Sequence, residues 1–347
     1  MIQTSARRRA LPLAVAATLA LATIGIVAPA TSAQGNNLAV TAGVGEGTVA
    51  GQSYLPGAFT VAVGDTVTYT IGSDDPHTIT FGTGPADIPP DAWPVSGFDA
   101  EPVAFDAPEP ADLGTASYDG TNFVNTSILG PKGSTATIEF TAAGTFPFFC
   151  AIHPGMVGEV TVVESGDVTT QEQADAAGQE TADALLAEEA PLREARTGQI
   201  SVADNADGTQ THNVFADAAT EPGPQPGGGA GLLELTEFFP PDIQIAAGDT
   251  ISWTASRAHT VTFIPEGTDP ATVFPSFEAV FAPLGGSTYD GTAPVNSGVF
   301  NFPAPDGSVV TEYSLTFPTE GVYPFFCAIH VSLGQMGSVT VGPAAAG

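Results

Sequence analysis

The chain has 347 residues, of which 38 are acidic and seven are basic, and its formal net charge at pH 7 is −31. A surface this acidic excludes nucleic acid and anionic lipid as partners bound through charge. The length suffices for two ordinary domains. The charge itself leaves three explanations open: a repulsive, well-solvated surface, adaptation to a salty medium that screens the repulsion, or steering toward a basic partner.

The first 33 residues have the features of an export signal. Arg7, Arg8 and Arg9 form a positive start, an apolar run follows over residues 11–27, and residues 30–33 supply the small side chains of a cleavage site. A membrane anchor is disfavoured because the run is short and rich in alanine, and no later stretch is apolar for long enough to span a bilayer. We expect a signal peptide at residues 1–33 and an exported mature protein, located in the periplasm, at the cell surface or outside the cell.

Residues 37–163, called here the first half, have the pattern of many short strands. Residues 59–63 and 66–71 alternate between apolar and polar side chains on either side of a Gly-Asp turn, and residues 134–140 alternate in the same way. An aromatic run then leads to Cys150, and residues 158–163 form a last strand. Strands with turn signals at short spacing and no strong helix predict an antiparallel β-sandwich.

Residues 199–342, the second half, repeat this pattern. The corresponding stretches are 63–67 and 247–251, 77–81 and 259–263, and 118–125 and 289–296. The two halves are therefore one fold duplicated. Residues 164–198 between them are rich in Ala, Glu and Gln with few large apolar side chains, and we expect a polar, partly helical linker there.

Both cysteines of the chain lie in one repeated stretch, Cys-Ala-Ile-His. It occurs as Cys150 to His153 and again as Cys327 to His330. Two cysteines in an exported protein ordinarily suggest a disulfide. That pairing is disfavoured here because each cysteine occupies the same place in its own repeat, so that a bridge would have to join equivalent sites of separate domains.

Each half also contains a histidine that precedes a Thr-Ile/Val-Thr-Phe strand, far from the cysteine in sequence. These residues are His77 and His259. A blue-copper site needs two imidazoles and one thiolate in a nearly trigonal plane, with a weak axial ligand. Zinc accepts the same residues, but the single thiolate per site and the apolar approach to each cysteine favour copper. The fifth histidine, His212, has no counterpart, and we expect it at the surface or in a turn.

With these residues in place, both halves resemble cupredoxin domains of the plastocyanin, amicyanin and pseudoazurin family. The resemblance implies two tandem Greek-key β-sandwiches, each with one type 1 copper ion. In the first half, Cys-Ala-Ile-His-Pro-Gly-Met resembles the short ligand loop of amicyanin. Carried over, it makes His77, Cys150 and His153 the equatorial ligands and Met156 the axial ligand. It also implies that His153 and His330 lie near the surface as exit routes for electrons.

The second half departs from this pattern after its ligand loop. Its equatorial ligands by resemblance are His259, Cys327 and His330, but alignment on the closing strand puts Gln335 at the position of the axial methionine and Met336 one residue beyond. Successive residues entering a strand point to opposite faces, so only one can serve. Strand register favours Gln335, and loop flexibility leaves Met336 open. A stronger oxygen donor favours oxidised copper, so the second site is expected to have the lower potential.

These observations predict an exported electron carrier that serves redox partner proteins and is not an enzyme. Duplicated cupredoxin domains also build laccases and copper nitrite reductases, but those enzymes need further histidines in His-x-His or His-Cys-His pairs. Phe149 and Phe326 precede the two cysteines, and His-x-His occurs nowhere. Copper buffering or delivery outside the cell is a further alternative, as is a structural surface protein that retains copper incidentally.

Overall fold

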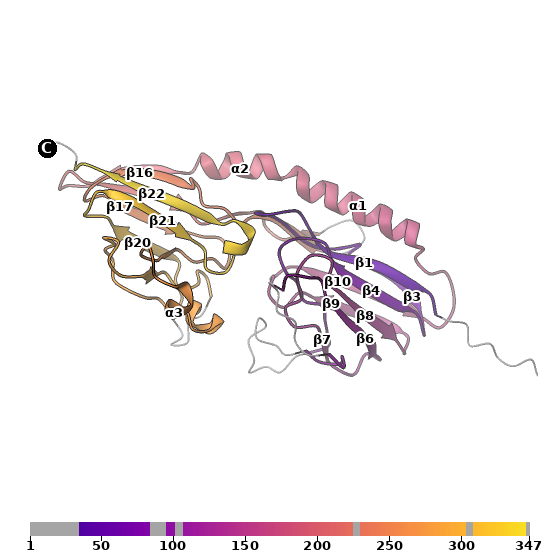
Figure 1. The fold of residues 1–347 in the computed structure, drawn as a ribbon. Helices are drawn as coiled ribbons and strands as arrows, with labels where there is room; N and C mark the ends of the chain where they lie inside the picture. The colour runs from indigo at the N-terminus through magenta and orange to yellow at the C-terminus, as the bar shows by residue number, and fades with distance from the viewer. Residues whose placement is uncertain (1–34, 84–94, 101–106, 225–229, 303–307, 345–347) are drawn as a thin grey trace, which may run out of the picture. The chain divides into compact units, whose positions relative to one another are not determined.

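The computed structural model describes residues 35–83, 95–100, 107–224, 230–302 and 308–344. The expected signal peptide at residues 1–33 lies outside this part of the chain. Within it, strands dominate and helices are few (Figure 1). No helix among these residues is long and apolar enough to cross a membrane.

The first half is built from two layers of strands. One layer has the order β6-β8-β4-β1-β2, and in the other β3 and β9 flank β10, with β5 and β7 beyond β9. The bounds are β1 (Asn37–Val44), β2 (Val49–Leu55), β3 (Ala58–Ala62), β4 (Thr66–Ile71), β5 (Thr80–Phe81), β6 (Asp112–Tyr118), β7 (Val124–Asn125), β8 (Thr135–Phe140), β9 (Gly144–Phe149) and β10 (Val157–Val163).

Alternation along the strands creates the core of the first half. In β4 every second residue is buried, so that Val67, Tyr69 and Ile71 point inward while the threonines between them are partly exposed. Period-two burial is what a strand with one face on a core produces. The ring of Phe148 on β9 contacts both Tyr69 and Phe81, at centroid distances of 5.5 and 5.1 Å. This aromatic cluster supports β9, the strand that Cys150 directly follows.

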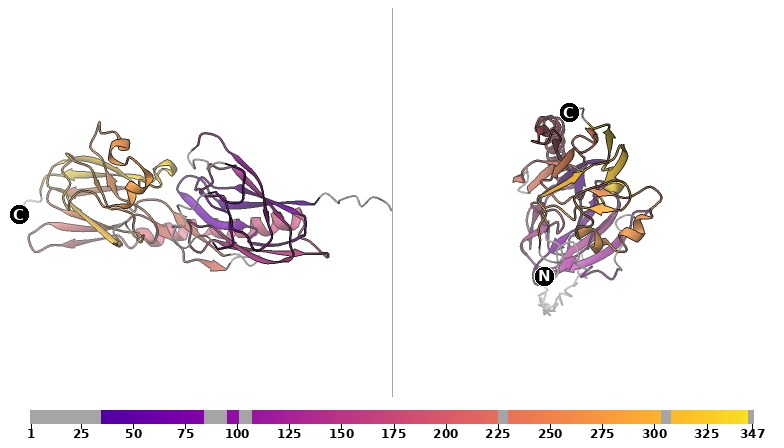
Figure 2. Two further views of the ribbon diagram at one scale, coloured as in Figure 1. Left: turned by 90° about the horizontal axis from the view of Figure 1, so that it is seen from below. Right: turned by 90° about the vertical axis from the view of Figure 1, so that its left-hand side faces the viewer.

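The second half repeats the arrangement of two strand layers, coloured largely orange to yellow in Figure 2. The strand orders of these layers are β11-β12-β17-β20 and β16-β22-β21-β18-β19. Trp253, Phe263 and Phe325 occupy its core in place of the first half's aromatic cluster. The bounds are β11 (Ser201–Asp204), β12 (Gln210–Phe215), β16 (Asp242–Ala246), β17 (Thr250–Thr254), β18 (Thr262–Phe263), β19 (Val295–Asn296), β20 (Glu312–Thr316), β21 (Gly321–Phe326) and β22 (Met336–Gly342), with α3 (Pro270–Val273), η2 (Phe277–Phe281) and η3 (Val331–Leu333) between strands.

The β-sandwich prediction is confirmed, but the sheets are mixed and not purely antiparallel. β1 and β4 run parallel, as do β3 and β10 in the same half. The second half has matching parallel pairs, β12 with β17 and β16 with β22. Two neighbouring strands run parallel when the chain between them crosses to the other layer of the sandwich. The alternation of apolar and polar residues does not reveal such crossings.

A third group of strands connects the halves. It comprises β13 (Ala218–Ala219), β14 (Gly223–Pro224) and β15 (Ala230–Leu235), where β13 and β14 both pair with β15. Although β15 belongs to the second half by sequence, it hydrogen-bonds antiparallel to β2 of the first half, with Glu234 opposite Ala50. Residues of the second half therefore extend a sheet of the first.

The segment between the halves is more helical than expected. It forms α1 (Gln171–Ala187) and α2 (Glu189–Thr197), and α1 starts with a capping box between Thr170 and Gln173. One face of α1 is buried, and it consists mainly of small residues that allow close approach to β1 and β2: Ala174, Gly178, Thr181, Ala182 and Leu185. The segment therefore packs against the sheet and is not a free spacer.

Candidate metal centres

In the first half, two chain segments bring His77, Cys150 and His153 together. His77 is held before β5 by reciprocal backbone hydrogen bonds with Leu129, at 3.1 and 2.8 Å. Cys150 directly follows β9, and the loop after it closes through a bond from the Cys150 N–H to the Met156 carbonyl, at 3.0 Å. The pairing of β5 with β9 sets these two segments side by side.

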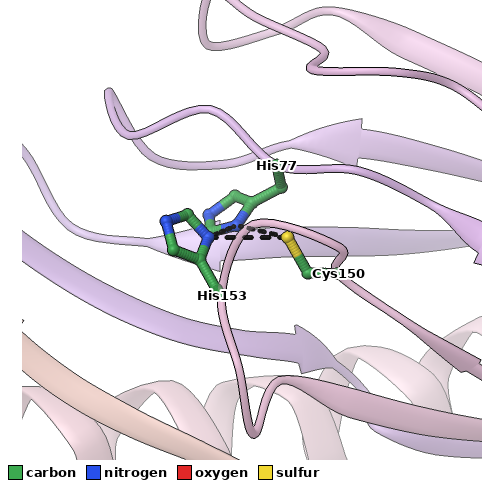
Figure 3. Close-up of side chains that lie close together, drawn as sticks. All are labelled: His77, Cys150 and His153. Carbon is green, nitrogen blue, oxygen red and sulfur yellow. Dashed lines mark hydrogen bonds between the residues drawn. The ribbon is translucent and has the colours of Figure 1, made fainter. Parts of the chain in front are cut away.

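The donor atoms of these residues form a triangle (Figure 3). Cys150 Sγ lies 3.9 Å from His77 Nδ1 and 3.5 Å from His153 Nδ1, and the two Nδ1 atoms are 3.0 Å apart. An ion bound at about 2.0 Å to nitrogen and about 2.3 Å to sulfur holds such donors roughly 3.5 to 3.7 Å apart. The triangle is close to this size, so the residues fit one small ion between two imidazoles and a thiolate.

The second half contains an equivalent triangle. Cys327 Sγ lies 3.9 Å from His259 Nδ1 and 3.7 Å from His330 Nδ1, and the Nδ1 atoms are 3.1 Å apart. Both cysteines are free and buried. The structure thus brings together all six residues that the sequence predicted as equatorial ligands, as two sets of three.

Hydrogen bonds fix the sulfur atoms and the imidazole tautomers. Backbone N–H groups of Thr78 and Thr260 donate to Cys150 and Cys327 Sγ, each at 3.3 Å. Ser73 Oγ donates to a backbone carbonyl, so its free lone pair accepts the Nε2–H of His77 at 3.0 Å. The proton on Nε2 leaves the Nδ1 lone pair of His77 directed at the triangle.

The charges of the metal-free sites favour thiolates. Burial raises the pKa of Cys150, but the neighbouring His153 and the hydrogen bonds to sulfur outweigh it, so the pKa lies below its usual value. Burial lowers the pKa of His153, yet the carboxylate of Asp75 and the thiolate of Cys150 raise it to about 9. For Cys327, burial is again outweighed by His330 and by bonds to sulfur, and its pKa falls well below the usual value. A thiolate is the form that binds metal.

The three candidates for the axial position lie in different environments. Met156 is fully buried in the core cluster that includes Cys150. Gln335 is also fully buried, and its Oε1 lies 2.9 Å from His259 Nδ1 while its Nε2 donates to the Ala216 carbonyl. Met336 has 56% of its surface exposed. The side-chain oxygen of Gln335 therefore lies against a nitrogen of the second triangle, whereas the side chain of Met336 is largely exposed to solvent.

Sequence analysis missed several buried carboxylates around the histidines. Asp75 Oδ2 lies 3.2 Å from His153 Nε2, and Glu234 Oε1 and Asp217 Oδ2 lie 2.8 and 3.5 Å from His259 Nε2. A signal for Glu234 exists in the sequence, because it is a single charge in the apolar run Gly-Leu-Leu-Glu-Leu. Its partner could not be predicted, because that depends on how β15 pairs.

Asp217, Glu234 and His259 also form a cluster that could hold a second cation. Its oxygens already have partners, however. Both oxygens of Asp217 accept backbone N–H bonds from Ser256 or Arg257, and Glu234 is bonded to Gln52 and to His259. The cluster is satisfied without an ion. His212, the remaining histidine, lies on β12 with Nε2 3.5 Å from Asp249 Oδ2 and joins none of the metal-ligand groups found among the described residues.

Paired strand layers around a buried His–Cys–His triangle are the features of a copper-binding β-protein. Residues 39–163 and 232–342, more than half of the chain, match the family described as copper binding proteins, plastocyanin/azurin family. The chain therefore belongs to that family, with a candidate His–Cys–His set in each half.

Individual relatives match about a third of the chain. The chain is 30% identical over 125 residues to plastocyanin of Capsella bursa-pastoris, covering 35% of this chain and 97% of the relative. It is 30% identical over 114 residues to plastocyanin of Vicia faba, covering 32% and 89%. The structure of oxidised plastocyanin from Dryopteris crassirhizoma aligns with 24% identity and a TM-score of 0.20, over 31% of this chain and 89% of that one.

Proposed function

We propose that the protein is an exported electron carrier that holds one type 1 copper ion in each half. The observation that supports this most strongly is the occurrence of two His–Cys–His triangles with the same donor atoms and nearly the same distances, in a chain of a copper-binding family. Copper bound there supplies a one-electron couple between Cu(II) and Cu(I).

The chain's contribution is to keep the ligands in place whichever oxidation state is present. Cys150 is 4% exposed and Cys327 is 0% exposed, and each sulfur receives a backbone N–H bond from the segment that precedes β5 or β18, outside its own ligand loop. His77 and His259 are fully buried and hydrogen-bonded on the side remote from the triangle. Ligands held this firmly have little room to rearrange, which suits rapid electron transfer.

We propose Met156 and Gln335 as the axial ligands, which makes the two sites unequal. The burial of Gln335 and the bond from its Nε2 to Ala216 direct Oε1 toward the triangle and support this choice over the exposed Met336. An oxygen donor favours Cu(II) more than a thioether does. The second site should therefore have the lower potential, and an electron that arrives there should pass to the first.

The surroundings of the ligand loops support electron transfer between the sites. Gly155, in the ligand loop of the first half, lies against Pro222 of the second, and Gly334 in the second ligand loop faces Thr48 of the first. Asp75 is close enough to act electrostatically on both His153 and His330. Both of these histidines are only partly exposed. We therefore propose that one electron-transfer step takes place between the two copper sites of the chain. The other step takes place between the chain and a redox partner protein.

Catalysis in the manner of a multicopper enzyme is not part of this proposal. A type 2 or trinuclear centre needs histidines beyond the two triangles. All five histidines lie in the described part of the chain, and His212 alone is outside the triangles, beside Asp249. The chain thus contains two sets of ligands for type 1 copper and one further histidine.

Copper loading of the purified mature chain tests the proposal. We expect intense absorption in the red part of the visible spectrum and two coppers per chain with type 1 signals in electron paramagnetic resonance. Separate redox titration of each site tests the direction of transfer, and equal potentials contradict it. A colourless copper-loaded protein refutes both sites, whereas a type 2 signal points to an enzyme.

A further inference from the structure

His259 and His77 differ in the group that accepts their outer hydrogen bond. For His77 the acceptor is the hydroxyl of Ser73, 3.0 Å from Nε2. For His259 the acceptor is a carboxylate oxygen, Glu234 Oε1, 2.8 Å from Nε2. Both imidazoles are fully buried, so neither bond competes with water. The same ligand position in the two halves therefore has a neutral partner in one and a charged partner in the other.

Glu234 is fixed by residues of the first half. It lies on β15 opposite Ala50 of β2 and is 4% exposed. Its second oxygen, Oε2, accepts from Gln52 Nε2 at 2.7 Å, and Gln52 is 3% exposed. Each carboxylate oxygen thus has its own partner, one in each half, and Glu234 links Gln52 of the first half to a ligand of the second site.

Asp217 adds a second carboxylate near Nε2 of His259. Its Oδ2 lies 3.5 Å from His259 Nε2, and its side chain is fully buried. The backbone N–H groups of Ser256 and Arg257 hold that carboxylate in place. Arg196 is one cation near it, with Nη2 3.8 Å from Oδ1. In a buried site, charges at these distances act far more strongly than in water.

We propose that Glu234 is a positioning residue that increases the preference of the second copper site for Cu(II). This rests on the proposed function. The Nε2–H bond to a carboxylate raises the electron density on the imidazole of His259, which makes Nδ1 a stronger donor and stabilises the more highly charged ion. The effect adds to that of Gln335 and has no counterpart at His77, whose partner Ser73 is neutral. The carboxylate of the first site, Asp75, lies at its other histidine, His153.

Glu234→Gln removes the charge and retains an oxygen that can accept from His259. We expect the ratio of Cu(II) to Cu(I) affinity at the second site to fall about tenfold, since loss of such an outer partner costs roughly 10–100-fold. For a one-electron couple, tenfold corresponds to a rise of about 59 mV in potential. The potential of the first site, measured in the same titration, should change much less.

Glu237→Gln is the matched control. Glu237 also joins the two halves, because its Oε1 accepts from Thr48 at 2.7 Å and its other oxygen pairs with Arg193, but it contacts no proposed ligand. Both potentials should stay at their wild-type values in this variant. If Glu234→Gln keeps its visible absorption and its second potential is unchanged, the role of Glu234 is refuted while the copper sites stand. If no copper binds to the wild-type chain, the proposed function itself fails.

A measurement on the wild-type copper-loaded chain covers the case in which the variant does not fold. In the diamagnetic Cu(I) form, the Nε2 proton of His259 should resonate at lower field than that of His77 in nuclear magnetic resonance, because its acceptor is charged. It should also exchange slowly. Equal resonance positions for the two protons, or a His259 proton lost to rapid exchange, overturn the proposed bond to Glu234.

Discussion

Gly43→Ala should disable the first copper site from a position outside the ligand set. Gly43 lies near the end of β1 with φ at +79°, and a Cβ there would lie 2.1 Å from His77 Nε2 and 2.4 Å from Ser73 Oγ. Ordinary contact begins at 3.4 Å, so the imidazole of His77 has to move by about 1.3 Å. That shift removes the bond to Ser73 which fixes the tautomer.

Two costs add in this variant. Alanine in the left-handed region costs roughly 1–2 kcal/mol, and the lost hydrogen bond costs about 1 kcal/mol, so the free energy of unfolding should fall by about 2–3 kcal/mol in the metal-free protein. Because a ligand is displaced, copper affinity in the first half should fall by roughly 10–100-fold or more. The second half should keep its copper and its potential.

Gly114→Ala separates backbone strain from displacement of His77. Gly114 has φ at +76° and nothing within 4 Å of an added Cβ. This control should show only the backbone cost, seen in denaturant unfolding, and retain both copper sites. Equilibrium dialysis with copper analysis and visible absorption compare the two variants. Equal copper affinity of the first site in Gly43→Ala and Gly114→Ala refutes the reasoning.

Further outcomes follow from the proposed ligands. Cys150→Ser and Cys327→Ser each remove one thiolate, so each variant should bind one type 1 copper; two such signals in either variant contradict the assignment. Gln335→Met should raise the potential of the second site, and Met336→Leu, at an exposed side chain, should not; the reverse result makes Met336 the axial ligand. Copper at 100 times its Kd should stabilise the folded chain by about 2.7 kcal/mol per site, and an unchanged unfolding midpoint argues against specific binding. Mass spectrometry of the exported protein should give a mature start directly after Ala33; retention of residues 1–33 would disprove cleavage.

The strands were predictable wherever one face of a strand is buried. The alternation in residues 66–71 corresponds to β4, whose odd residues form the core. The pairing partners of the strands were not predictable. The pairing of β1 with β4, and of β12 with β17, depends on which layer the connecting chain enters. The period of the hydrophobic residues specifies which face of a strand is buried. Which strands pair with one another is decided by tertiary packing.

The residues of the two His–Cys–His triangles were predictable for a different reason. A cysteine and a histidine three residues apart must lie close together, and the repeat supplied the distant histidines, His77 and His259, at matching positions. The outer partners were not predictable. Glu234 reaches His259 only because β15 adds to β2, and no spacing in the sequence records that contact.

The helical segment shows the limit of arguments from composition. Its scarcity of large apolar side chains suggested a solvated linker. In the structure, Ala174, Gly178 and Ala182 form a narrow buried face on α1, and Leu186 and Leu192 pack against a small core around Leu233. Small residues allow a helix to approach a sheet closely, so that the helix buries surface area without large apolar side chains.

A redox titration of the copper-loaded full chain, followed by visible absorption with the metal content determined on the same sample, tests the two-site account most directly. It should give two type 1 coppers per chain that titrate in two steps. The Cys150→Ser variant should retain the step at lower potential, because the second site carries Gln335 and Glu234. A single copper per chain, a colourless complex, or two steps at the same potential would contradict the account.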